Sequence, residues 1–288
     1  MIIFERFLHP MMKILAIATA YHPDTELMKK SISSYIGGVD RLLIWRNSPI
    51  DEKEFEALAG AGKIEFCGDC SNAGISVALN HAWRYARDGG YSHLLTMDQD
   101  SLWQGFEAFT DFVKKRGDED CFYAPGVNDE SLESGFEEAE TMITSGMLVP
   151  VGMLDEIGGY REDFKVDGID NDLFYHAKAL GWRPFKVGGC TLHQQFGRLQ
   201  FHKFLRWRIG TLNYSAERIY SIYRNNYIVI RSYPGTEPMK KRFRKSCFWN
   251  RPIRILLAEK DRYAKFKAMF RGIRDAKRWL KENPSVTF

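Results

Sequence analysis

The residues best suited to chemistry are two aspartates, Asp98 and Asp100, which directly follow the apolar run 94–97. The run has the length and bulk of a buried strand, whose side chains alternate between two faces. The two carboxylates therefore point the same way where the strand ends, and they repel each other unless a cation lies between them. Such oxygen ligands suit Mg²⁺ or Mn²⁺, with substrate phosphates completing the shell. The pattern predicts a metal–diphosphate site; an Asp-rich turn that caps the next helix is the alternative.

A second group of acids, Asp167, Asp170 and Asp172, lies within six residues at the start of a predicted helix. We expect Asp170 to cap this helix, which runs to Leu180 and stops at Gly181. The helix dipole would stabilise anions there without any further role. Alternatively Asp170 is a general base on a turn that faces the pocket. The local sequence leaves both interpretations open.

Two further candidates are weaker. His193 ends a predicted strand at 190–193 and is either a metal or phosphate ligand or an ordinary core or surface histidine. Cys67 and Cys70 form a single Cys-x-x-Cys with no second pair or histidines at zinc spacing, so we interpret them as plain thiols.

Apolar strands alternate with helical patterns over the first part of the chain. This alternation predicts an α/β fold with a doubly wound, mostly parallel sheet, in which ligands bind at the carboxyl ends of the strands. Asp98 and Asp100 would meet His22, Asn47 and Asn72 at that edge. The predicted elements are strand 13–21, helix 24–35, strand 41–45, helix 52–59, strand 63–67, a helix opening at 72, and the strand into 98.

No Gly-x-Gly-x-x-Gly follows the first strand and no Walker loop occurs, so metal-assisted binding of a diphosphate is favoured over a glycine loop. Beyond 101 we expect helix 105–115, strand 121–125, an acidic loop at 130–140 and strand 141–150. Ser145 and Gly146 in that last strand would allow a ligand to lie close to the backbone.

The composition is that of a globular protein, with 44% apolar residues among 288. No apolar run of about 18 residues exists that could span a membrane, and the start has no signal-peptide pattern. Met11 and Met12 offer a second start, which makes 1–12 a candidate N-terminal extension. Five cysteines without framework spacing fit a reducing cytoplasm.

The positive charge is concentrated at the end of the chain. From 240 onward there are sixteen Lys and Arg against four acids, a net +12; since the whole chain carries +4, the rest is net −8. We expect a long helix at 206–231 and a basic amphipathic helical tail at 234–288 with a helix at 254–282. The segment 240–281 would lie on an anionic membrane surface or pack on the preceding α/β domain. No nucleic-acid motif accompanies the charge, and no nucleic acid is expected.

Several short pieces, in chain order, resemble the inverting family-2 glycosyltransferases with the GT-A fold, and within them the rhamnosyltransferase-like group. The resemblance covers about 13–233, which would be the catalytic domain. The pieces are Tyr21-His22-Pro23, Asn47-Ser48, Asn72-Ala73-Gly74 through Asn80, Asp98-Gln99-Asp100-Ser101, Thr144-Ser145-Gly146, Asp167 through Asp172, Leu192-His193 and Arg218 through Asn225.

The resemblance implies roles for these residues. Asp98 and Asp100 would contact the nucleotide and the metal, with His193 near the diphosphate, and Asp170 would be the catalytic base. Two departures stand out: Arg46 occupies a position where the family usually has Asp, and Ile169 one where many members have Glu. The residues expected to bind the nucleotide sugar are Tyr21, Asn47, Asn72, Gly74, Asn80, Asp98, Ser145, Gly146, Asp172, Arg218 and Arg224.

The implied activity is a metal-dependent inverting transfer of a sugar, with rhamnose as the first expectation. The donor would be dTDP-rhamnose or a UDP-sugar, the cofactor Mg²⁺ or Mn²⁺, and the acceptor a glycan or lipid-linked glycan in cell-surface polysaccharide synthesis. The location would be cytoplasmic, peripheral on the inner face of the plasma membrane. A nucleotidyltransferase and a non-catalytic carbohydrate-binding relative are the alternatives.

Overall fold

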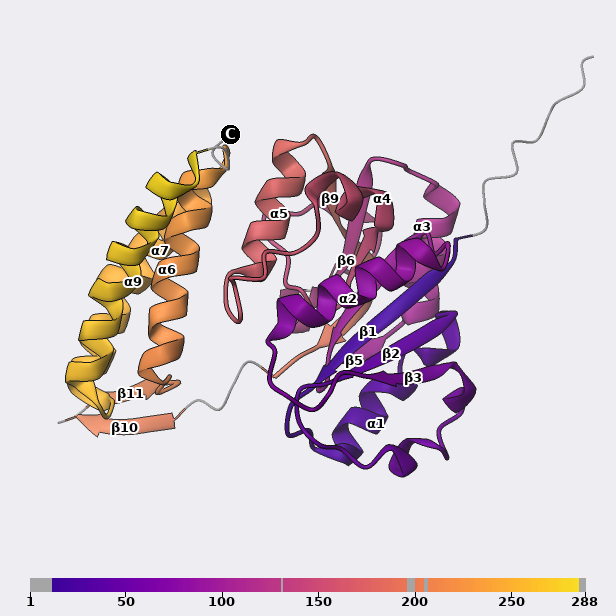
Figure 1. Ribbon diagram of the computed structural model, residues 1–288, viewed down its shortest axis with the longest axis horizontal. Helices are drawn as coiled ribbons and strands as arrows, with labels where there is room; N and C mark the ends of the chain where they lie inside the picture. The colour runs from indigo at the N-terminus through magenta and orange to yellow at the C-terminus, as the bar shows by residue number, and fades with distance from the viewer. Residues whose placement is uncertain (1–11, 131, 196–199, 205–206, 285–288) are drawn as a thin grey trace, which may run out of the picture. The chain divides into compact units, whose positions relative to one another are not determined.

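The computed structural model describes residues 12–130, 132–195, 200–204 and 207–284 (Figure 1). The chain divides into two compact units. Unit 1 comprises the described parts of Met1–Ala73, Ala78–Gly159 and Trp182–Gln194; unit 2 comprises those of Gly74–Val77, Tyr160–Gly181 and Gln195–Phe288. The predicted boundary at 233/234 therefore falls inside unit 2.

Unit 1 is built on one sheet with strand order β3-β2-β1-β4-β8-β6-β9-β5, and β7 also pairs with β9. The first four strands run parallel, as predicted, whereas β8 is antiparallel to both β4 and β6, and β5 and β7 are antiparallel to β9. The strands are β1 Ile14–Ala20, β2 Arg41–Arg46, β3 Ile64–Cys67, β4 His93–Asp98, β5 Leu102–Gln104, β6 Cys121–Val127, β7 Phe136–Glu138, β8 Met147–Pro150 and β9 Arg183–His193.

Helices cover both faces of this sheet. Helices α1 (Thr25–Ser33) and α3 (Phe106–Arg116) share a buried cluster with one set of alternate strand residues, such as Ala16 of β1. Leu15 is also fully buried and faces the opposite side, where α2 (Ile75–Asp88) crosses in front of the strands in Figure 1. The doubly wound arrangement places the carboxyl ends of β1, β2 and β4 at one edge.

Several predicted elements of unit 1 are shorter or different. The predicted helix 52–59 is only the 3₁₀ turn η2 (Glu52–Phe55), and the acidic loop 130–140 contains β7. The predicted strand 141–150 begins only at Met147. The remaining short elements are η1 (Ile36–Gly38), η3 (Ala61–Lys63), η4 (Asn128–Glu130) and α4 (Val151–Ile157).

Unit 2 consists of helices and one hairpin. Its elements are α5 (Ile169–Ala179), β10 (Gln200–Phe204), β11 (Trp207–Thr211), α6 (Ala216–Ser232), α7 (Glu237–Phe243), the π-helical η5 (Arg244–Asn250), α8 (Arg251–Ala258) and α9 (Arg262–Glu282). The predicted helix 206–231 is wrong at its start, because 207–211 pair in the hairpin. Ser215 then caps α6 by accepting a hydrogen bond from the Arg218 N–H at 3.2 Å.

The predicted helix 254–282 is also interrupted. Asp261 has a left-handed backbone (φ +53°), which separates α8 from α9. The apolar face of α9 packs against α6: Met269 is buried in one cluster with Tyr223, and Phe266 and Ile273 pack onto that cluster. This face is therefore occupied within unit 2, whereas Phe270 of the same helix is exposed. Contact of 240–281 with a membrane stays a prediction.

No helix among the described residues is long and apolar enough to cross a membrane.

Two neighbouring glycines test the packing of unit 1. Both Gly158 (φ +82°) and Gly159 (φ +85°) are left-handed, so alanine costs about 1–2 kcal/mol at either position. A Cβ on Gly159 would lie 2.5 Å from Trp83 and 2.6 Å from the Asn80 side chain, whereas one on Gly158 meets nothing within 4 Å. We expect Gly159→Ala to lower the free energy of unfolding by about 1–3 kcal/mol more than Gly158→Ala in urea titrations. Equal losses would contradict this packing.

Candidate functional site

The carboxyl ends of β1 and β2 are joined by hydrogen bonds beyond the sheet ladder. The Asn47 N–H donates to the Ala20 carbonyl at 2.8 Å, and the His22 N–H donates to the Ser48 hydroxyl at 2.7 Å. Asn47 is buried, and its side-chain oxygen accepts from the Trp45 indole at 3.1 Å. Asn47 thus holds the strand ends together at the predicted ligand edge.

Gln99, between the two aspartates, ties β4 to β1. Its side-chain oxygen accepts from the Tyr21 N–H at 2.8 Å, and its side-chain nitrogen donates to the Tyr21 carbonyl at 3.2 Å. The Tyr21 ring remains 50% exposed and lies edge-on to His22. The sequence analysis missed this role for Gln99, because an amide between two acids carries no signal of its partner.

Ser145 and Gly146 support the aspartate turn from beneath. The Ser145 hydroxyl accepts from the Asp98 N–H at 3.0 Å and donates to the Ser101 hydroxyl at 2.8 Å. Ser145 is buried, and a Cβ on Gly146 would lie 3.0 Å from Leu192. Both residues predicted to line the ligand are therefore buried, and Ser145 positions Asp98.

The Asp98 carboxylate is held by Gln194. The Gln194 side-chain nitrogen donates to Asp98 Oδ2 at 2.6 Å. The Asn128 side-chain oxygen accepts from the Gln194 N–H at 3.1 Å, and the Asn128 side-chain nitrogen donates to the Gln194 carbonyl at 3.0 Å. Gln194 Oε1 is buried with no hydrogen-bond partner among the described residues, an acceptor that is available to a ligand. Gln194 was also missed, since 96 residues separate it from Asp98.

Asp100 is partly buried, and this burial raises the pKa of its carboxyl. A divalent cation would offset the burial by favouring the charged form. Carboxylate oxygens of Asp98 and Asp100, together with diphosphate oxygens, form a donor set that Mg²⁺ or Mn²⁺ accepts, so the residues present fit such an ion.

His193 does not complete a protein-only metal site. Its side chain is exposed, and its Nε2 lies 3.1 Å from Gln104 Oε1 on the neighbouring strand. Within the part of the chain that the structure describes, no group of three or more His, Cys, Asp or Glu side chains is arranged to hold a metal. The pair Asp98 and Asp100 would need ligands from a substrate or water.

The departure at Arg46 has a structural use. Its guanidinium pairs with Glu52 and donates to the Gly68 carbonyl at 2.7 Å. These bonds connect the end of β2 to the turn after β3. The arginine thus takes part in loop packing at the end of β2.

The three predicted residues from the helix opening lie in different surroundings. Asn72 is exposed in unit 1. Gly74, in unit 2, is left-handed (φ +90°), and a Cβ there would lie 3.2 Å from the Lys165 carbonyl oxygen. Asn80 is buried in α2 beside Gly159. Burial gives Asn80 a packing role in unit 1.

In unit 2, Asp170 lies in the first turn of α5. The prediction that it caps this helix is wrong, because Gly168, with φ +89°, occupies the cap position. Burial raises the pKa of Asp170 to about 6, and the charge of Asp167 adds to this rise. A carboxyl that titrates near neutrality is suited to accept a proton.

Helix α6 holds the loop before α5. The Asn225 side chain donates to the carbonyls of Val166 and Asp167 at 3.1 and 2.8 Å. Arg218 pairs with Asp167 at 3.2 Å. Arg224 pairs with Asp163 at 2.6 Å. The two arginines predicted to bind the donor are therefore engaged with loop acids, and Asn225 is an additional positioning residue.

Asp172 is anchored in the interior of unit 2. Its carboxylate accepts from the Tyr233 hydroxyl at 2.9 Å and pairs with Arg161 at 3.1 Å. Arg161 in turn lies over the Trp279 ring at 4.7 Å. Burial raises the pKa of Asp172, and Arg161 opposes that rise. The arrangement ties α5 to the loop, α6 and α9, which is a structural role.

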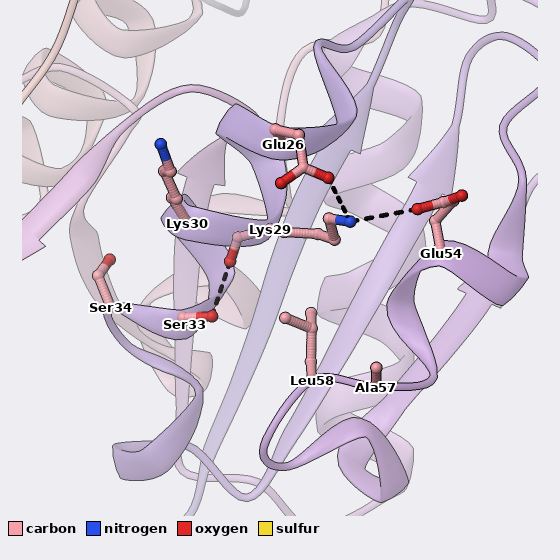
Figure 2. Close-up of a pocket in the computed structure, with 8 residues that line it drawn as sticks. All are labelled: Glu26, Lys29, Lys30, Ser33, Ser34, Glu54, Ala57 and Leu58. Atoms are coloured by element: carbon pink, nitrogen blue, oxygen red, sulfur yellow. Dashed lines mark hydrogen bonds and ion pairs between the residues drawn. The ribbon is translucent and has the colours of Figure 1, made fainter.

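One surface hollow of about 510 Å³ lies beside α1. Figure 2 shows Lys29 reaching between Glu26 and Glu54, at 3.2 Å from the latter. The three charges largely satisfy one another, and no predicted site residue lines this hollow.

No protein-family model and no curated protein sequence matches the chain. Solved structures do match. S. aureus TarS 1-349 is 12% identical with a TM-score of 0.59, over 92% of this chain and 81% of that one. S. aureus TarS 1-349 in complex with UDP-GlcNAc is 13% identical with a TM-score of 0.58, over 92% of this chain and 82% of that one. GalNAc-T7 with UDP, GalNAc and Mn²⁺ is 9% identical with a TM-score of 0.60, over 95% of this chain and 57% of that one.

These likenesses define the fold. The mixed α/β sheet with helices on both faces and further helices after it is the GT-A type, and the predicted fold class is confirmed. At this level of identity the comparisons assign no role to individual residues.

Asp172 of α5 and Asp163 of the loop before it should contribute differently to the stability of the protein. We expect Asp172→Ala to lower the free energy of unfolding by about 3–5 kcal/mol, because it leaves the Arg161 charge buried and unpaired. The control, Asp163→Ala, removes a partly exposed carboxylate and should cost within about 1 kcal/mol. Urea unfolding measures both losses. A loss within about 1 kcal/mol for Asp172→Ala as well would contradict the structural role of this carboxylate.

Proposed function

We propose that the protein is a glycosyltransferase that moves a sugar from a nucleoside-diphosphate sugar to an acceptor hydroxyl. The observation that carries the proposal is the pair Asp98 and Asp100 at the carboxyl end of β4 in a GT-A fold. Two structures of similar fold contain UDP-GlcNAc, or UDP with GalNAc and Mn²⁺, which supports a nucleotide-sugar donor.

Asp98 and Asp100 would bind Mg²⁺ or Mn²⁺ together with the donor diphosphate. Such an ion, when bound, neutralises negative charge on the leaving diphosphate. The protein's own contribution is to hold the carboxylates in place: Gln194 orients Asp98, while Gln99 and Ser145 hold the turn between them. The predicted contribution of His193 stays a prediction.

Asp170 is proposed as the base. The acceptor oxygen forms a bond to the anomeric carbon as the bond from that carbon to the diphosphate oxygen breaks. The acceptor proton passes to the Asp170 carboxylate, and the nucleoside diphosphate leaves with its electron pair. Attack from the face opposite the leaving group inverts the configuration, as in the inverting glycosidases.

The finer assignment rests on the residue pattern. We propose the inverting family-2, rhamnosyltransferase-like group, with dTDP-rhamnose as donor before a UDP-sugar. The acceptor would be a glycan or lipid-linked glycan of a cell-surface polysaccharide, which implies a cytoplasmic, peripheral location. The absence of a glycine-rich loop after β1 argues against a nucleotidyltransferase. A carbohydrate-binding relative without activity would show no transfer from any donor.

Donor and metal can be identified together by thermal shift. We expect one nucleotide or nucleotide sugar to stabilise the protein only when Mn²⁺ or Mg²⁺ is present, by about 2.7 kcal/mol at a hundredfold excess over its dissociation constant. Asp100→Asn should remove the metal-dependent part, whereas the surface control Asp88→Asn should retain it. Stabilisation that is equal with and without metal would contradict the assignment of Asp100.

The pH dependence of transfer tests the base. Because Asp170 must be ionised to accept a proton, kcat/KM should fall as the pH drops through about 6. Asp167→Asn removes the neighbouring charge that raises the pKa of Asp170, and asparagine tolerates the left-handed backbone there (φ +59°). The acidic limb should therefore move to lower pH in this variant, and an unmoved limb would contradict the assignment.

Asp170→Asn should abolish transfer without destabilising the protein. The pKa is raised in the folded state, so the ionised carboxyl destabilises the fold; this penalty is absent below the ordinary value of 3.8 and complete above about 6. The variant should thus melt higher than the parent above that pH and equal it in acid. A lower melting temperature in neutral buffer would indicate a structural role for Asp170.

A further inference from the structure

An apolar stripe lies exposed on the helical segment formed by η5 and α8. Its members are Phe248, Trp249, Ile253 and Leu256, which are 52%, 69%, 50% and 56% exposed. We call these four residues the 248–256 stripe. Trp249, Ile253 and Leu256 follow one another at spacings of four and three, so they share one helical face.

The same segment already has a buried apolar face. Cys247 and Ile255 are buried in one cluster with Phe243 at the end of α7 and with Ile219 and Tyr223 of α6. The Tyr223 hydroxyl also donates to the Cys247 carbonyl inside the π-helical turn. The inward face thus belongs to the core of unit 2. The Phe248 ring also lies edge-on to Tyr223 and Phe243 of that core. Trp249, Ile253 and Leu256 are not members of the cluster. Contiguous exposed apolar side chains of this kind mark a surface that binds something.

Positive charge surrounds the stripe. Residues 238–258 include no acid but seven Lys and Arg. Five of them, Lys241, Arg242, Arg244, Lys245 and Arg254, are exposed, and none of these five forms an ion pair with an acid among the described residues. A protein partner could match such a surface only with a strongly acidic face, whereas an anionic bilayer matches both the charges and the apolar stripe.

We propose that the 248–256 stripe docks the protein on an anionic lipid surface. Trp249 would lie at the level of the headgroups, where an aromatic ring with a polar edge is favoured, and Ile253 and Leu256 would enter the acyl boundary. The exposed cations would contact lipid phosphates. The inference deepens the proposed function, because a lipid-linked acceptor is presented at such a surface, but the binding itself requires no transfer.

The proposal is tested by sedimentation of the full-length protein with vesicles. Vesicles that contain phosphatidylglycerol should bind the protein about tenfold more tightly than pure phosphatidylcholine vesicles, and added salt should weaken this binding. The triple variant Trp249→Ser, Ile253→Ser, Leu256→Ser should lose about tenfold in affinity. The matched control changes Tyr263 and Phe270 to Ser; both side chains lie on α9 and are 81% and 75% exposed.

Several outcomes would overturn the proposal. Equal binding to neutral and anionic vesicles would contradict it, as would an equal loss of affinity in the α9 control. A stripe variant that alters only self-association in size-exclusion chromatography would assign the stripe to a second copy of the chain. Brominated acyl chains should quench parent tryptophan fluorescence more than that of Trp249→Phe, and unchanged quenching would also contradict it. Metal-dependent stabilisation by the donor is measured on the same proteins without vesicles, so failure of lipid binding and failure of the proposed transfer are separable.

Discussion

A buried chain of hydroxyl groups determines where the two aspartates lie. Ser31 donates to the Ser101 carbonyl, Ser145 donates to the Ser101 hydroxyl, and Ser145 accepts from the Asp98 N–H. Buried hydroxyls need partners, so each bond constrains the others. The turn is therefore held through backbone and hydroxyl groups, and Gln194 donates to Asp98 Oδ2 at 2.6 Å.

Two carboxyl groups on α5 show how surroundings separate chemical roles. Asp172 faces Arg161 and Tyr233, which satisfy its charge inside unit 2. Asp170, two residues earlier, is partly buried and forms no ion pair among the described residues. This burial, together with the like charge of Asp167, raises the pKa of Asp170 to about 6. When two neighbouring acids have environments that differ in this way, one carboxylate can anchor the structure and the other can accept a proton. The loop that contains Asp167 is held in turn by Asn225 of α6.

Helix α6 therefore serves two parts of unit 2. One face positions the loop before α5, and another packs against α9, where Gly272 allows close approach: a Cβ there would lie 2.8 Å from the Tyr220 carbonyl oxygen. This packing uses Phe266, Met269 and Ile273 of α9, while the 248–256 stripe is exposed on the neighbouring segment. The basic helix α9 is thus a core element of unit 2. The neighbouring 248–256 stripe is the better candidate for contact with lipid.

Local pattern was sufficient for the parallel strands β1 to β4, for the carboxyl-edge position of Asp98 and Asp100, and for the helix that contains Asp170. These features follow from side-chain alternation and helical periodicity within a few residues. The hairpin at 207–211, the antiparallel pairing of β8, and the roles of Gln99, Gln194 and Arg46 were not predictable in this way. The roles of Gln99 and Gln194 depend on partners distant in the chain: Tyr21 lies 78 residues from Gln99, and Asp98 lies 96 from Gln194. The hairpin instead pairs segments only a few residues apart. Periodicity reports which face of an element is apolar, whereas the tertiary contacts select which polar groups meet and so which acids remain free to react.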